Sequence, residues 1–226
     1  MKSFTPHLAS PPPGQREFWP HLAPLQNQGF VLYGGTALTL RLGHRESKDF
    51  DLFANQPLHR DAVRHSIPQL TSAQTIQDES HTQVLRLPLK AGTSIISLFG
   101  NIRIGRVGEP EITEDNVIPV ASLIDIFAMK LKVILERAES KDYLDIAAIL
   151  RSGERLERGV GAAIALYPDI QAKSVLKALA FYDDGDLSTL SPDDRELLSG
   201  HARAFRDVET AHIVSQSLVV RQFARP

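Results

Sequence analysis

The sequence has no cysteine among its 226 residues, which excludes disulfide bonds, thiol catalysis and cysteine-based zinc or iron–sulfur sites. It also lacks any apolar run near the roughly 20 residues that a helix needs to cross a bilayer. Neither sign of charge dominates: the net charge is −2, so contact with nucleic acid would require a local basic patch. Residues 1–14 are rich in proline and lack the apolar segment of a signal peptide. We therefore expect a cytoplasmic protein with no membrane partner.

The residues that are present predict an α+β fold, with a mixed sheet of about five strands, flanking helices and a helical C-terminal half. Strands are expected at 30–33, 49–53, 72–77, 82–89 and 93–99, with a hairpin turn at 91–92 and a short further strand at 102–107. Helices are expected at 17–28, 37–42, 57–70 (broken by prolines), 123–137, 141–151, 155–166, 170–182 and 192–215. We divide the chain into a lead-in (1–14), a core (15–119) and a helical region (120–226) that completes the active site.

Two acids alternate with apolar residues in the expected strand at 49–53. Side chains alternate faces along a strand, so Asp49 and Asp51 share one face, while Phe50 and Leu52 share the other. Two neighbouring carboxylates repel each other, and a divalent cation such as Mg²⁺ removes the repulsion by taking both as hard oxygen ligands. The alternative is a solvent-facing strand with two exposed acids.

A glycine turn precedes these acids by 15 residues. An expected buried strand ends at Gly34 and Gly35, and Thr36 then caps a helix that Gly43 ends. Glycines let the backbone approach an anion closely, and a helix N-terminus offers free N–H groups, so this turn can cradle phosphate. Between turn and acids, Arg45 and Ser47 can contact phosphate oxygens. A simple strand–helix turn and a solvated arginine are the alternatives.

A lysine lies on the apolar side of the expected helix at 123–137. On a helical wheel, Lys130 falls in the middle of the face formed by Leu123, Phe127, Leu131 and Ile134. A lysine there is costly unless its ammonium reaches water or an anion. Two readings remain: the side chain extends to solvent, or the ammonium balances the charge of a triphosphate.

A charged segment follows Lys130 within eleven residues. Lys141, Asp142 and Asp145 lie at the start of the next expected helix, which Ser140 can cap. Acids in the first turn of a helix complement its dipole, and this alone explains the two aspartates. Ser122 and Asp125 are likewise typical of a capping box for the preceding helix.

Taken in order, these motifs resemble the AbiEii/AbiGii toxin family of nucleotidyltransferases over roughly residues 28–150. The resemblance implies a core like that of DNA polymerase β and Mg²⁺-dependent binding of an NTP, with Mn²⁺ as an alternative ion. It also implies a toxin role opposed by an antitoxin protein, often in phage defence, and tRNA as the acceptor in some relatives. In the implied site, Gly34, Gly35 and Thr36 form the phosphate turn, and Arg45 and Ser47 assist it. Asp49 and Asp51 are the metal ligands, and Lys130 contacts the triphosphate. The following helix adds Lys141 and Asp142, with Asp145 as the weakest member of the site.

The sequence departs from the nucleotidyltransferase pattern in one respect. Many such enzymes carry a third carboxylate on a neighbouring strand, as the base that activates the acceptor hydroxyl, whereas no acid occurs here between Glu79 and Glu109. Either Asp142 takes that role, or the site binds nucleotide with little turnover. The leading hypothesis is an NTP:acceptor nucleotidyltransferase. The alternatives are a nucleotide-binding interaction protein and a phosphotransferase that uses the same cradle.

Overall fold

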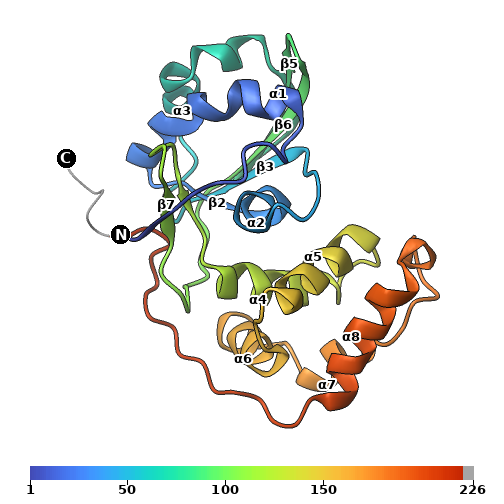
Figure 1. The fold of residues 1–226 in the computed structure, drawn as a ribbon. Helices are drawn as coiled ribbons and strands as arrows, with labels where there is room; N and C mark the ends of the chain where they lie inside the picture. Colours follow the sequence, from blue (N-terminus) through green and yellow to red (C-terminus); the bar gives the residue numbers. More distant parts are fainter. Residues whose placement is uncertain (221–226) are drawn as a thin grey trace. The chain divides into compact units, whose positions relative to one another are not determined.

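In the computed structural model, which describes residues 1–220, the chain forms two compact units (Figure 1). Of the described residues, the first unit comprises 1–104, 109–122 and 216–220, and the second comprises 105–108 and 123–215. The first unit contains the sheet, and the second is helical.

The sheet of the first unit has eight strands in the order β1-β7-β8-β2-β3-β6-β5-β4. Their bounds are β1 Ser3–Phe4, β2 Val31–Tyr33, β3 Asp49–Phe53, β4 Gln74–Glu79, β5 Thr82–Leu89, β6 Gly92–Phe99, β7 Glu111–Thr113 and β8 Pro119–Val120. β3 pairs antiparallel with β2 and parallel with β6, so the sheet is mixed. The α+β class is therefore confirmed, with eight strands rather than five.

One face of the sheet is covered by the N-terminal helices α1 (Pro13–Phe18) and η1 (Trp19–Gln28). The ring of Phe50 on β3 lies 6.2 Å from that of Phe18 and 6.3 Å from that of Trp19. Phe50 and Leu52 are buried there. The burial of this face leaves Asp49 and Asp51 on the opposite face of β3, as the alternation predicts.

The expected broken helix at 57–70 is α3 (Arg60–Ser66) followed by the 3₁₀ turn η2 (Pro68–Ser72). The hairpin between β5 and β6 turns at Ala91 and Gly92, as expected. The expected strand at 102–107 is wrong: Arg106 forms only an isolated bridge with Ser215. β1, β7 and β8, of two or three residues each, are too short to give a periodic signal and were not predicted.

The second unit contains five helices among the described residues, labelled in Figure 1. They are α4 Leu123–Val133, α5 Ser140–Arg151, α6 Leu156–Leu166, α7 Ala172–Ala178 and α8 Pro192–Ala204, with a 3₁₀ turn η3 at Leu187–Thr189. α4 packs against both α5 and α6, and α8 packs against α5 and α7. Each expected helix of this half is present, although most are shorter than predicted.

The expected helix at 192–215 is wrong in its second half, because α8 ends at Ala204. Beyond it the backbone of Glu209 packs on α6: its N–H donates to the Glu157 carbonyl at 3.2 Å. A Cβ on Gly161 would lie 1.7 Å from the Glu209 carbonyl oxygen, so only glycine allows this approach. These contacts with α6 hold the segment outside a helix. In the described part of the chain, no helix has the length and apolar character needed to cross a membrane.

Candidate active site

The glycine turn joins β2 directly to α2 (Gly34–Leu42). Gly34 adopts a left-handed φ of 71°, which favours glycine, and it is already the first residue of the helix. The expected cap at Thr36 is therefore wrong, since the helix begins two residues earlier. The Thr36 hydroxyl instead donates to the backbone carbonyl of Asp49 and accepts from Gln15 Nε2 at 3.3 Å. Thr36 thus fastens the start of α2 to the start of β3.

α2 is also anchored near its C-terminal end. The Arg41 guanidinium forms an ion pair with Glu111 on β7 and donates to the Ala121 carbonyl at 2.9 Å. Its guanidinium carbon lies 4.5 Å from the centre of the Phe4 ring on β1. The helix that presents the turn is therefore fixed to the sheet at both ends.

The Asp51 carboxylate lies over the glycine turn. A Cβ built on Gly34 would lie 2.0 Å from Asp51 Oδ2, so the carboxylate occupies space that any other residue would fill. Asp49 and Asp51 are both half-buried and share a face about 7 Å apart along the strand. The structure therefore brings the predicted acid pair and the predicted phosphate turn together.

Two further predicted residues cover Gly35. A Cβ on this glycine would lie 2.8 Å from Arg45 Nη2 and 2.8 Å from Ser47 Oγ. Arg45 is held by a hydrogen bond from its Nη1 to the Glu46 carbonyl at 2.7 Å, and Ser47 is buried. A guanidinium, a hydroxyl and a carboxylate therefore surround the N-terminus of α2, where free N–H groups favour an anion.

The donor set at this site fits a magnesium ion. Among the described residues, no group of three or more histidines and acids that could hold a metal occurs, so the pair provides two carboxylates only. Mg²⁺ binds through one or two carboxylates and completes its shell with substrate phosphates and water. Asp49 and Asp51 beside a phosphate turn match that requirement, and the same hard oxygens suit Mn²⁺.

The strand next to the acids carries no carboxylate at the facing positions. The parallel register of β3 and β6 places Ser97 beside Asp51 and Ile95 beside Asp49. On the other side, Tyr33 of β2 pairs with Asp51. No local sequence pattern distinguishes Ser97 or Tyr33, because only strand pairing shows that they flank Asp51.

Lys130 lies in the second unit, where it is buried between two carboxylates. Its Nζ is 2.7 Å from Asp142 Oδ1 and 2.7 Å from Asp145 Oδ2, and both aspartates are fully buried on α5. Burial by itself lowers the pKa of Lys130, but Asp145 and Asp142 outweigh this effect and raise that pKa above its usual value. The side chain therefore does not extend to solvent, and Asp145 contacts it as closely as Asp142 does.

The other charged residues of this segment also have partners in the second unit. Arg137 Nε lies 2.9 Å from the second oxygen of Asp142, and Lys141 Nζ lies 2.6 Å from Glu139. Ser140 is not the cap of α5: it is the first helical residue, after Glu139. Its N–H and hydroxyl donate to Asp186, at 2.6 and 2.8 Å, and these bonds lower the pKa of Asp186.

The carboxylate of Asp125, which is expected to take part in a capping box with Ser122, contacts a short segment before β7. Its Oδ1 accepts hydrogen bonds from the backbone N–H groups of Val107 at 2.7 Å and Gly108 at 3.3 Å. This carboxylate therefore holds the short segment 105–108 against α4.

Comparison with known proteins gives a family match over most of the chain. The family model described as nucleotidyl transferase AbiEii toxin, type IV TA system, matches residues 21–207. An uncharacterized protein of Aquifex aeolicus (strain VF5), aq_aa25, is 29% identical over 158 residues, which cover 69% of this chain and 74% of that protein.

Two solved structures are also similar. MenT4, the nucleotidyltransferase toxin Rv2826c from Mycobacterium tuberculosis H37Rv, has a TM-score of 0.49 and 14% identity, over 83% of this chain and 91% of its own. The antibiotic-resistance factor ANT(2'')-Ia has a TM-score of 0.47 and 15% identity, over 65% of this chain and 86% of its own.

Proposed function

This chain belongs to the AbiEii family of nucleotidyl transferase toxins of type IV toxin–antitoxin systems, and on that premise we propose that it moves a nucleotide from an NTP to an RNA acceptor in a Mg²⁺-dependent reaction. The observation that carries the proposal is the position of the Asp51 carboxylate over Gly34, on the same strand face as Asp49. Two metal-binding oxygen donors and a phosphate cradle then lie within one site.

Each predicted site residue of the first unit has a defined role in this proposal. The N–H groups at the start of α2 bind the triphosphate, and the Arg45 guanidinium and Ser47 hydroxyl over Gly35 neutralise and orient its distal phosphates. Thr36 contributes its backbone N–H, because its hydroxyl already holds Asp49 in place. When bound, Mg²⁺ supplies charge stabilisation at the attacking and leaving oxygens of an in-line displacement.

The chemical step exchanges one P–O bond for another. The acceptor hydroxyl attacks the α-phosphorus, the bond to the β-phosphate oxygen breaks, and pyrophosphate leaves. Arg45 stabilises the charge that develops on the leaving group. With Ser97 and Ile95 on the neighbouring strand, the hydroxyl proton passes to Asp142, the base that the family resemblance implies, or to water.

The roles that the family resemblance gives to Lys130, Lys141 and Asp142 stay part of the proposal. They are a triphosphate contact, an assisting cation and a base for the acceptor. The ion pairs of Lys130 with Asp142 and Asp145 give this cluster a structural part as well. We further propose tRNA as the acceptor, the cytoplasm as the place of action, and an antitoxin protein as the opposing partner.

A second candidate is a nucleotide-binding interaction protein with little turnover, and the facing residues Ser97 and Ile95 favour it. One experiment separates the candidates: the protein is incubated with each α-labelled NTP, Mg²⁺ and total cellular RNA, and the products are resolved. We expect labelled RNA and pyrophosphate, with no label transferred by Asp49→Asn. NDP as the product would establish a phosphotransferase instead, and binding without product would establish the interaction protein.

A further inference from the structure

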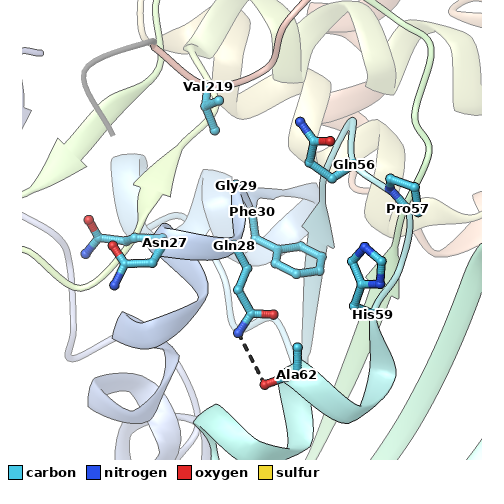
Figure 2. A pocket seen from close by; sticks show the side chains of 10 residues that line it. Asn27, Gln28, Gly29, Phe30, Gln56, Pro57, His59, Ala62 and Val219 are labelled. Atoms are coloured by element: carbon cyan, nitrogen blue, oxygen red, sulfur yellow. Dashed lines mark hydrogen bonds between the residues drawn. The ribbon is translucent and has the colours of Figure 1, made fainter. Parts of the chain in front are cut away.

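A cavity of the first unit, shown in Figure 2, is lined by residues that flank β2 and β3 at the ends away from the glycine turn. Phe30 directly precedes β2, and Gln56 follows β3, whereas Gly34 and Asp49 lie at the other ends of these strands. Along the strand, Phe30 and Gly34 are about 13 Å apart. The cavity holds about 320 Å³, which is at the small end of the range for ligand pockets.

The lining of this cavity includes polar side chains but, within residues 1–220, no charged residue of the Asp, Glu, Lys or Arg type. A phosphate or carboxylate ligand needs a cation or a cluster of N–H donors, and an ammonium ligand needs an acid or an aromatic cage. The lining therefore selects a neutral ligand, and the triphosphate belongs to the glycine turn.

Polar side chains with unused hydrogen-bonding capacity face the cavity. Asn27, Gln56 and His59 make no side-chain hydrogen bond to the rest of the described chain, and Figure 2 shows them around the cavity with Gln28. Gln28 donates through Nε2 to Ser66 Oγ at 2.8 Å, while its side-chain oxygen accepts no hydrogen bond from the described residues. A carboxamide has both donors and acceptors, so the matching ligand must present both along one edge.

The remaining lining is apolar. Figure 2 shows Phe30, Pro57 and Val219 among the residues around the cavity; Phe30 is only 3% exposed, so Pro57 and Val219 supply more of the apolar surface that a ligand would meet. Unpaired nucleobases are recognised through this combination of an aromatic or apolar surface with hydrogen bonds to the base edges. Asn and Gln carboxamides pair in a bidentate manner with adenine.

We propose that this cavity binds an uncharged nucleobase, adenine first among them, of the acceptor rather than of the NTP. The inference rests on the proposed function for the choice of an RNA acceptor. Because the cavity and the glycine turn lie at opposite ends of the strands, the bound base belongs to a nucleotide beside the reacting one and sets the register of the acceptor. A free nucleoside carries the same base, and the KM for RNA distinguishes the two sources.

The test measures adenosine binding without Mg²⁺, by NMR of the side-chain amide signals and by calorimetry. We expect adenosine to shift the signals of Asn27, Gln28 and Gln56, and Gln56→Ala to weaken binding about three- to tenfold. Gln56 is exposed, and its backbone carbonyl, which accepts from the Asn101 N–H at 2.7 Å, is unaffected, so the variant should fold. The matched control is Gln74→Ala on the exposed strand β4, which should bind as the wild type does.

Two further comparisons decide the outcome. Adenosine binding that is lost in Asp51→Asn but unchanged in Gln56→Ala would place the base at the glycine turn and overturn the proposal, as would the absence of any binding. If Gln56→Ala also raises KM for RNA at constant kcat, the base is that of the acceptor RNA; an unchanged KM would overturn the assignment to the acceptor and leave a free nucleoside as the ligand. Because the adenosine titration needs no transfer, it stands even if the wild type transfers no label.

Discussion

At the scale of single residues, the Asp49 carboxylate is exceptional in making no hydrogen bond or ion pair within the described part of the chain, although it is half-buried. Its side chain therefore contributes little to folding, while its backbone carbonyl is held by Thr36. A half-buried carboxylate without a partner, next to a second acid, is typical of a cation-binding site.

We predict that Asp49→Asn lowers nucleotide transfer by at least about a hundredfold, because loss of a hard anionic ligand costs several kcal/mol of charge stabilisation. The melting temperature without metal should stay the same or rise slightly, since repulsion from Asp51 is relieved. Transfer kinetics and thermal melting of the same preparations check both parts. A variant that melts much earlier would mean that Asp49 is structural.

Lys130, in contrast to Asp49, has a charge that is paired inside the protein, with Asp142 and Asp145. Lys130→Met leaves Asp142 and Asp145 buried without the cation between them, so we expect a loss of about 3–5 kcal/mol of unfolding free energy. The neighbouring Lys132 is half-buried, pairs with Glu136 on the surface and lies 5.5 Å from the centre of the Tyr167 ring, so Lys132→Met should cost only about 1 kcal/mol. Denaturant unfolding of both variants measures the difference, and equal small losses would contradict a structural ion pair.

The raised pKa of Lys130 fixes the sign of a pH effect. A lysine that binds its proton more tightly in the folded state stabilises the fold fully below its unfolded pKa of about 10.4, and this stabilisation is lost as pH rises through the folded pKa. The stability gap between the wild type and Lys130→Met should therefore be constant from about pH 7 to 10 and shrink only above that. A gap that closes below pH 9 would oppose this assignment.

At the scale of elements, α2 carries a left-handed glycine at each end, Gly34 at its start and Gly43 just after its last residue. Their backbone angles are similar, with φ of 71° and 62°. Their surroundings differ: a Cβ on Gly34 would meet the Asp51 carboxylate at 2.0 Å, and one on Gly43 would meet His7 Nδ1 at 3.1 Å. Substituting each glycine in turn therefore distinguishes the effect of backbone strain, which both positions share, from displacement of the Asp51 carboxylate, which only Gly34 would cause.

We predict that Gly34→Ala and Gly43→Ala each cost about 1–2 kcal/mol of stability, the strain of a left-handed alanine. Only Gly34→Ala should also abolish Mg–NTP binding, because its methyl group displaces the Asp51 carboxylate. Calorimetric titration of Mg–ATP into both folded variants provides the measurement. Equal loss of binding in the two would show that the geometry of α2 as a whole, rather than the place of Asp51, governs the site.

At the scale of the whole molecule, stability should depend on metal and nucleotide together. A ligand at 100 times its Kd adds about 2.7 kcal/mol, which for a chain of this size corresponds to a rise in Tm of about 5–11 °C. We expect this rise with Mg–NTP, a much smaller one with NTP and EDTA, and none in Asp49→Asn. An undiminished rise in EDTA would show that the nucleotide binds without the acid pair.

Local patterns predicted much of the first unit and of the candidate site. The alternation of residues 49–53 placed Asp49 and Asp51 on one face, and the glycine turn after a buried strand is where α2 begins. Strand alternation and glycine conformations are properties of neighbouring residues, so they can be recognised without knowledge of the fold. The hairpin of β5 and β6 was predictable for the same reason.

Other features depended on contacts between residues distant in sequence. The pairing of β3 with β6, which puts Ser97 beside Asp51, joins segments more than forty residues apart. The partners of Lys130 come from another helix, and the segment after Ala204 is held against α6 rather than in the helix that its local propensity favours. Local sequence thus determined which side chains share a face or a turn, whereas tertiary packing decided which neighbours each of them meets, because burial and long-range hydrogen bonds outweigh propensities of less than about 1 kcal/mol per residue.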